Sequence, residues 1–267
     1  MASSESLAPT RVGMPAASSI LSTRDLAPRR PAQAGPASVA GVPARYRILR
    51  TDEVDAKDPP LSIPELKDVM ATGAAAATRT SGDTFAGTAR AAAKLSISTA
   101  VIEPFDDIKG LIDSLPSKSK MVHHQPPITT DADSDRVQEE ERNVRVTAFL
   151  YAASRENDND FHLIVGRDPS SDPPMYMTME ISGLPPSNAA SFARLKAARA
   201  AYTGFFGNDL PGASYDFYDP PIPIRVEGSL FFDMSHANGR SPGPPSLHDD
   251  MPVIWEVHPI SDIVFEP

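Results

Sequence analysis

The sequence contains no cysteine, and this absence removes several classes of chemistry at once. Disulfide bonds, thiolate catalysis and zinc sites with sulfur ligands are all excluded. No apolar run approaches the roughly 20 residues that cross a bilayer, and the N-terminus lacks the apolar core of a secretory signal peptide. We therefore expect a soluble, cytoplasmic protein without a membrane partner.

Aromatic residues are scarce in the first half of the chain. Only Tyr46, Phe85 and Phe105 precede Asn143, and every other Phe, Tyr and Trp residue follows it. Each aromatic side chain buries roughly 150–250 Å² in a core. The folded core is therefore expected in residues 143–267.

The residues before this core divide into two predicted segments. Residues 1–42 alternate small residues with prolines and are predicted to be a disordered tail, because they bury too little apolar surface to offset their chain entropy. Their excess of arginine over acidic residues is also typical of an organelle transit peptide, and that alternative stays open. Residues 43–142 are predicted to form a partly helical arm and an acidic linker. In this arm, 46–50 is an edge strand or docking strip, and helices begin after Ser62 and span 105–115.

The alternation of apolar and polar residues after Asn143 predicts five strands. They are expected at 144–150, 161–165, 175–182, 222–232 and 253–265, with a helix that begins at Ser187 between the third and fourth. Gly228 interrupts the fourth strand and predicts a bulge. The expected fold is mainly β: a five-stranded barrel of the oligonucleotide/oligosaccharide-binding type (OB-like). One helix lies between strands three and four, and a disordered and helical N-terminal arm precedes the barrel.

The charge balance argues against nonspecific nucleic-acid binding. The chain has a formal net charge of −10, and residues 143–267 contain 8 Lys and Arg against 16 Asp and Glu. Nonspecific binding depends on Lys and Arg displacing counterions from phosphates. An acidic barrel without a run of basic residues is a poor generic phosphate binder.

A first polar cluster lies between the first two predicted strands. Asp158, Asp160 and His162 alternate along the chain and are candidate ligands for a divalent metal ion. The same stretch, 157–160, is also a strong turn sequence. We favour the turn, and the metal ligands remain the alternative.

A second cluster lies at the ends of the last strands. Asp233 and His236 follow the fourth strand, while Glu256 and His258 face one side of the fifth. Together they are candidates for general acid–base catalysis or metal binding. Ordinary capping of the strand ends explains the same residues, and the chain has neither a nucleophile elbow nor a His-Glu-x-x-His motif.

Four charged residues lie at the polar positions of the predicted strands: Arg145, Glu180, Arg225 and Glu227. Cross-strand ion pairs on a solvated barrel face require only such alternation. Each exposed pair would contribute roughly 0–1 kcal/mol. We expect these residues to have that role.

The runs 161–166, 228–233 and 255–259, together with Glu180, resemble a group of uncharacterised bacterial proteins with a C-terminal OB-like barrel. In that group a short acidic turn precedes a His-Leu strand, a Phe-Phe-Asp strand ends near a histidine, and Glu-x-His-Pro closes the domain. The resemblance implies no activity. The topology is also similar to that of staphylococcal-type nucleases, whose paired arginines around a calcium site have no matching motif here.

The sequence as a whole favours a non-catalytic domain that binds a small ligand, a glycan or a protein partner. The alternative is a metal-dependent hydrolase or phosphodiesterase of nuclease-like barrel fold that uses the two polar clusters. We expect no cofactor, with a divalent metal ion as the open alternative. The two functions differ in whether these side chains converge within about 2.0–2.6 Å of a common point.

Overall fold

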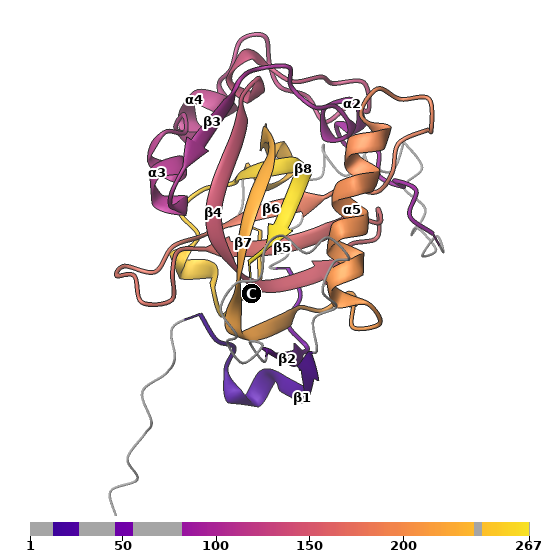
Figure 1. Ribbon diagram of the computed structural model, residues 1–267. Helices are drawn as coiled ribbons and strands as arrows, with labels where there is room; N and C mark the ends of the chain where they lie inside the picture. Colours follow the sequence, from indigo (N-terminus) through magenta and orange to yellow (C-terminus); the bar gives the residue numbers. More distant parts are fainter. Residues whose placement is uncertain (1–12, 27–45, 56–81, 238–241, 267) are drawn as a thin grey trace, which may run out of the picture.

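The computed structural model describes residues 13–26, 46–55, 82–237 and 242–266. Within these ranges the fold is mainly β, with one mixed sheet of eight strands (Figure 1). The strands are β1 (Ile20–Leu26), β2 (Tyr46–Thr51), β3 (Ile102–Phe105), β4 (Asn143–Arg155), β5 (Phe161–Gly166), β6 (Tyr176–Ile181), β7 (Asp216–Phe232) and β8 (Trp255–Phe265). The α-helices are α2 (Ala91–Leu95), α3 (Ile108–Asp113), α4 (Lys118–Val122) and α5 (Phe192–Phe206).

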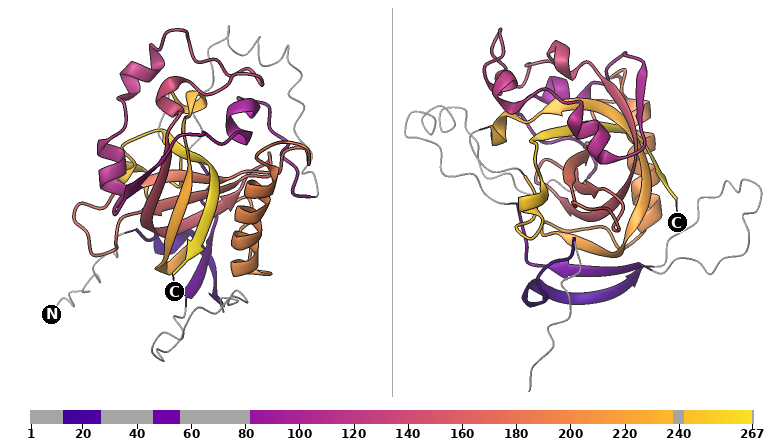
Figure 2. Two further views of the ribbon diagram at one scale, coloured as in Figure 1. Left: turned by 45° about the horizontal axis from the view of Figure 1, so that its top comes forward. Right: turned by 90° about the vertical axis from the view of Figure 1, so that its left-hand side faces the viewer.

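The strands follow the order β1-β2-β7-β8-β6-β5-β4-β3, and β4 also pairs with β7. This additional pairing closes β4, β5, β6, β8 and β7 into a ring. The β6–β8 and β3–β4 pairs are parallel, and the other pairs are antiparallel. Helix α5 follows β6 in the chain and packs against β8, while β1 and β2 lie at the opposite end of the molecule from α3 and α4 (Figures 1 and 2).

The five strands expected from residue alternation coincide with β4, β5, β6, β7 and β8. Their inward residues, among them Leu163, Met179, Val226 and Val257, form the main hydrophobic core. The pairing register of β7 with β8 shifts on both sides of Gly228, which confirms the predicted bulge. The sequence therefore located the strands of the ring correctly.

The outer face of the ring is buried as well, which the alternation did not indicate. Every residue of β5 and β6 is buried. Ile164 and Tyr176 on the outer face belong to a second hydrophobic cluster with Leu247 and Met251 of the β7–β8 connection. A strand with two buried faces loses the wet polar side that the period-two pattern predicts.

The expected disordered tail needs correction. Residues 20–26 form β1, which pairs with β2, and β2 in turn pairs with β7. Leu26, at the end of β1, is packed in the main core. Residues 13–19 are described as well and include a short 3-10 helix, Ala17–Ser19, whereas 1–12 and 27–42 lie outside the described residues.

The expected arm agrees with the structure in part. The 46–50 segment is a strand, β2, whereas the helix start at Ser62 lies outside the described residues. The helix expected over 105–115 is shorter: α3 covers Ile108–Asp113, because Phe105 ends β3 and Asp107 caps the helix through the amide of Lys109. A β-strand and a cap therefore replace the first turn of the predicted helix.

Residues 83–98, which we call the covering segment, lie along the ends of the ring strands. The Phe85 amide donates to the Leu184 carbonyl at 3.0 Å, and the Ala86 amide donates to the Asp158 carbonyl at 2.9 Å. A Cβ atom at Gly183 would come within 2.6 Å of the Phe85 Cα atom. This close backbone approach therefore requires glycine at position 183.

A buried ion pair fixes the covering segment. The two terminal guanidinium nitrogens of Arg90, Nη1 and Nη2, each donate to the Glu140 carboxylate at 2.7 Å, and both side chains are buried. Glu140 also accepts from the Phe232 amide at 2.8 Å, and Arg90 donates to the Phe232 carbonyl at 3.1 Å. The pair thus joins the start of α2 to the end of β7.

Gly183→Ala is expected to destabilise the protein by about 1–3 kcal/mol, because the new methyl group overlaps backbone atoms of Phe85 that cannot move aside cheaply. Gly204→Ala on the exposed side of α5 is the control, since a Cβ atom there meets nothing within 4 Å. Thermal unfolding of both variants measures the difference. Equal melting temperatures would show that the covering segment does not depend on this contact.

Candidate metal centre

A stripe of polar side chains crosses the outer face of the ring. His162 on β5 pairs in register with Glu180 on β6, and Thr178 on β6 pairs with Glu256 on β8. His258 lies two residues beyond Glu256 and therefore faces the same side of β8. Three neighbouring strands thus direct their polar residues to one place.

This stripe is buried despite its outward direction. The exposed fraction is at most 3 % for His162, Glu180 and Glu256, and His258 is fully buried. The covering segment lies against β8 through α2, and the Phe231 ring lies 5.4 Å from the His258 ring. Water is therefore largely excluded from a group of ionisable side chains.

His258 is surrounded by three carboxylates. Its Nδ1 atom lies 3.1 Å from Glu180 Oε2 and 3.6 Å from Glu256 Oε2, while Nε2 lies 3.4 Å from Asp160 Oδ2. The other oxygen of Asp160 accepts from the Gly183 amide at 2.6 Å, which fixes the carboxylate in place. The five residues Asp160, His162, Glu180, Glu256 and His258 are called the buried cluster below.

Several atoms of the buried cluster make no hydrogen bond of normal geometry among the residues that the structure describes, although those of His258 lie within 3.1–3.6 Å of the carboxylates. They are Asp160 Oδ2, His162 Nε2, Glu180 Oε2, Glu256 Oε2, and both ring nitrogens of His258; the neighbouring Thr178 Oγ1 has none either. A buried polar atom without a partner costs roughly 1–3 kcal/mol. Such a concentration of these atoms at one place requires an explanation.

The buried cluster holds more carboxyl groups than its surroundings can keep ionised. Burial and the neighbouring carboxylates raise the pKa values of Asp160 and Glu256 well above the ordinary range. Burial also opposes ionisation of Glu180, but His258 and Lys94 outweigh it and hold the pKa of Glu180 low. Burial of Lys94 on α2 would lower its pKa, but the neighbouring carboxylates of Glu180 and Asp160 outweigh burial and raise the pKa well above its ordinary value.

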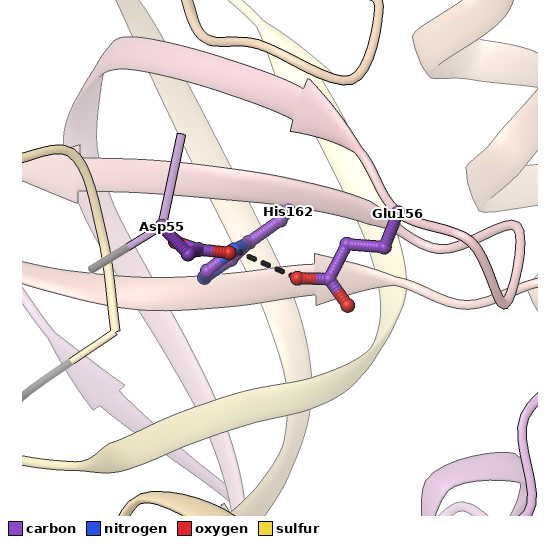
Figure 3. A group of neighbouring side chains, drawn as sticks. All are labelled: Asp55, Glu156 and His162. Atoms are coloured by element: carbon purple, nitrogen blue, oxygen red, sulfur yellow. Dashed lines mark hydrogen bonds and ion pairs between the residues drawn. The ribbon is translucent and has the colours of Figure 1, made fainter. Parts of the chain in front are cut away.

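A second group of side chains adjoins the cluster at His162 (Figure 3). His162 Nδ1 lies 3.3 Å from Asp55 Oδ2, 3.2 Å from Glu156 Oε1 and 3.0 Å from the Tyr215 hydroxyl. The Tyr215 hydroxyl donates to the other oxygen of Asp55, which also accepts from the Gly243 amide at 2.9 Å. These contacts occupy Nδ1 and leave Nε2 as the ring nitrogen directed elsewhere.

An open cleft of about 420 Å³ lies above this second group. Its lining includes Asp55, Glu156 and Asp158, and also Arg155. Burial raises the pKa of Glu156 to about 7, against the opposing influence of His162. The cleft is thus acidic, and one of its carboxylates titrates near neutral pH.

The structure brings four of the predicted site residues together: Asp160, His162, Glu256 and His258. Asp158 lies beside them, 3.8 Å from the Lys94 ammonium. Asp233 and His236 instead form a pair with each other at the end of β7, where Asp233 caps a short 3-10 helix, Met234–His236. The predicted catalytic and metal candidates therefore merge into one cluster, with Asp233 and His236 at its border.

The role expected for Glu180 was wrong, because this residue was predicted to form an exposed ion pair. It is buried at the centre of the cluster, since its outer face of β6 is covered. The expectation holds for Arg145, which pairs with Glu227 at 2.6 Å, while Arg225 lies 3.7 Å from Glu266.

Sequence reasoning also missed Asp55, Glu156, Tyr215 and Lys94. Glu156 immediately precedes the predicted turn, and its position beside the candidate Asp158 was a usable signal. Asp55 and Lys94 lie far from the ring strands in sequence, in segments that carry no motif. Only the tertiary fold brings them to the cluster.

No family model, curated protein or solved structure matches this chain. The resemblance to the bacterial protein group therefore stays a prediction. Among the described residues, no helix is both long and apolar enough to cross a membrane.

Glu156→Gln should change the pH dependence of stability between pH about 4.5 and about 7. The folded-state pKa of Glu156 is raised from 4.5 to about 7, so the native state gains stability from the bound proton at low pH. This contribution is complete below pH about 4.5 and is lost as the pH rises through about 7. Chemical denaturation across this range should therefore show a shallower decline for the variant.

Glu103→Gln is the matched control. Its hydrogen bonds with Arg142 lower the pKa of Glu103, so this residue contributes stability above pH about 4.5 that is lost as the pH falls. The control should alter only the acidic side of the profile. An unchanged slope near neutral pH in Glu156→Gln would contradict the raised pKa.

Proposed function

We propose that this chain binds a divalent transition-metal ion through the buried cluster. The observation that carries the proposal is the set of buried oxygen and nitrogen atoms without hydrogen-bond partners on five adjacent residues. Buried polar atoms are normally paired, and metal coordination is one of the arrangements that satisfies them. The proposal therefore accounts for these atoms with a single ligand class.

The donor chemistry supports an ion of intermediate hardness. The cluster offers carboxylate oxygens and imidazole nitrogens, and the sequence has no cysteine. Zn²⁺, Mn²⁺ and Fe²⁺ accept such mixed sets, whereas Ca²⁺ prefers 6–8 oxygen ligands. Donors at about 2.0–2.1 Å from one ion lie about 3.0–3.4 Å apart. The 3.1 Å separation of His258 Nδ1 and Glu180 Oε2 falls in that interval, whereas the 3.4 Å separation to Asp160 is measured from Nε2, the other nitrogen of the ring.

The contacts of His162 also support coordination. A metal-binding histidine normally presents its second ring nitrogen to a carboxylate, which fixes the ring and its tautomer. His162 Nδ1 lies beside Asp55 and Glu156, and Nε2 has no partner among the described residues. In this proposal, Asp55 and Glu156 orient the ligand and do not bind the ion.

We propose in addition that the ring is an OB-like barrel. In that fold, the face of the second and third strands and the loops 1–2 and 4–5 bind ligands. The corresponding parts of this ring are β5, β6, the 156–160 turn and the β7–β8 connection. They surround the buried cluster, so the ligand-binding position of the fold class coincides with the proposed metal site.

The cluster could also be neutralised without a metal ion. In that case, protons bound to Asp160 and Glu256, together with the Lys94 ammonium, would balance the charge. The two accounts differ in proton release. Metal binding must displace the protons from Asp160 and Glu256, and also one from His162, whose pKa Asp55 and Glu156 raise despite its burial. Affinity should therefore increase steeply with pH. Neutralisation by protons alone predicts a cluster that is indifferent to added metal.

EDTA-treated protein should gain thermal stability on addition of Zn²⁺ or Mn²⁺. An ion at 100 times its Kd stabilises the native state by about 2.7 kcal/mol. His258→Gln removes a central ligand and should abolish both the thermal shift and the metal detected by elemental analysis. Circular dichroism of the variant checks that it is folded.

Glu227→Gln is the control for this experiment, because Glu227 pairs with Arg145 on the ring and is not part of the cluster. It should bind metal as the original chain does. Wild-type protein that binds neither ion and shows no thermal shift would refute the proposal.

Hydrolysis in the adjacent cleft is a second candidate function. The specific observation is Glu156, which lines the cleft, contacts His162 and has a pKa near the value suited to a general base. The sequence favoured binding of a small ligand, a glycan or a protein partner. That function stays a prediction, and this cleft is the proposed place of binding.

The metal-loaded protein should hydrolyse a chromogenic ester or phosphodiester if this candidate is correct, and Glu156→Gln should lower kcat by about 10²–10⁴-fold, the contribution typical of a general base. The two rates are compared at equal metal content, because Glu156 also orients the ligand His162. Equal rates in both proteins would exclude Glu156 as the base, and no rate in either would leave binding as the only supported function.

A further inference from the structure

The buried cluster contains two donor groups that share one residue. Asp160, Glu180 and His258 form one group, and His162, Glu180 and Glu256 form the other; within each, the donor atoms lie within 4.8 Å of one another. Each group has one imidazole, one carboxylate of its own, and Glu180. The two groups therefore offer the same types of ligand, with Glu180 common to both.

The sheet register explains this arrangement. Glu180 lies on β6, between β5 on one side and β8 on the other. The antiparallel pairing places His162 directly across from Glu180, and the parallel pairing of Thr178 with Glu256 brings His258 alongside Glu180. Glu180 thus has a histidine on each neighbouring strand.

One ion does not accommodate all five donors. Ligands of a single ion at about 2.1 Å are separated by at most about 4.2 Å. The donors form two triads and no single group of five within 4.8 Å. A carboxylate has two oxygens and can bind one ion with each, as in two-metal sites with ions about 3.5–4 Å apart.

The charges of the surroundings agree with two ions. Carboxylates outside the five donors add negative charge beside the cluster: Asp158 and Asp233, and also Asp55 and Glu156 at His162. Asp158 lies 3.8 Å from Lys94, and Asp233 is close enough to raise the pKa of Glu256.

We infer that the buried cluster is a two-metal centre in which Glu180 bridges the ions. Asp160 and His258 complete the coordination of one ion, and His162 and Glu256 complete that of the other. This inference rests on the proposed metal-binding function and specifies its stoichiometry and its bridging ligand. Divalent first-row ions such as Mn²⁺ fit the one-imidazole, two-carboxylate set of each half.

The test uses the full chain, stripped with EDTA and reloaded with Mn²⁺. Elemental analysis should give two ions per chain, and electron paramagnetic resonance should show a magnetically coupled pair in place of the signal of isolated Mn²⁺. Both measurements are made on the unaltered sequence, so they do not depend on whether a variant folds.

Variants separate the two halves. Asp160→Asn should retain the ion of His162 and Glu256, and Glu256→Gln should retain the ion of Asp160 and His258. Each should reduce the content from two ions to one and remove the coupling. Glu180→Gln should remove the coupling as well, and Glu227→Gln should retain both ions and the coupled signal.

The outcomes distinguish this inference from the function on which it rests. One uncoupled ion in the unaltered chain would overturn the bridging role of Glu180 and leave the metal-binding proposal intact. No bound ion would overturn both. Two uncoupled ions would also refute the bridge, because they would have to occupy separate sites.

Discussion

The ion pair between Arg90 and Glu140 is the interaction on which the rest of the site depends. It holds the covering segment against the end of β7 and thereby encloses the outer face of the ring. Arg136 reinforces the same junction, since its guanidinium donates to the carbonyls of Ala93 and His258. Removal of one partner of such a buried pair costs about 3–5 kcal/mol, because the other charge stays buried and uncompensated. Without this closure, the polar stripe would face water and its charges would be screened.

Enclosure gives the ionisable residues their unusual properties. A carboxylate in water needs no partner, but Asp160 and Glu256 are buried beside Glu180 and therefore favour the neutral form. The same burial strengthens any attraction to a cation, because the effective dielectric constant is low. The protein thus maintains several unfavourable groups in one place, which is typical of functional sites and not of cores selected for stability alone.

Local patterns predicted the ring strands well but predicted their surroundings poorly. Alternation in 161–165 and 175–182 reports which residues share a face, so His162 and Glu180 were placed correctly relative to Leu163 and Met179. It cannot report whether the second face is wet, and Glu180 was therefore expected in a solvated pair. The role of Lys94 follows only from the path of the chain around the ring. Strand β1 was not predicted, and β2 was predicted only as one of two alternatives, for a related reason. Their residues Leu26, Tyr46 and Ile48 are buried by β7 and the main core, which lie far away in sequence.

The position of β7 has a consequence for the order in which the protein assembles during synthesis. Its first residues pair with β2, and its later residues pair with both β4 and β8. A ribosome releases β1 and β2 long before β7 exists, so this hairpin must wait for a partner strand that is made some 170 residues later. His258 arrives later still. Contacts between such distant parts of a chain form slowly, and the cluster can therefore gather its donors only after His258 has left the ribosome.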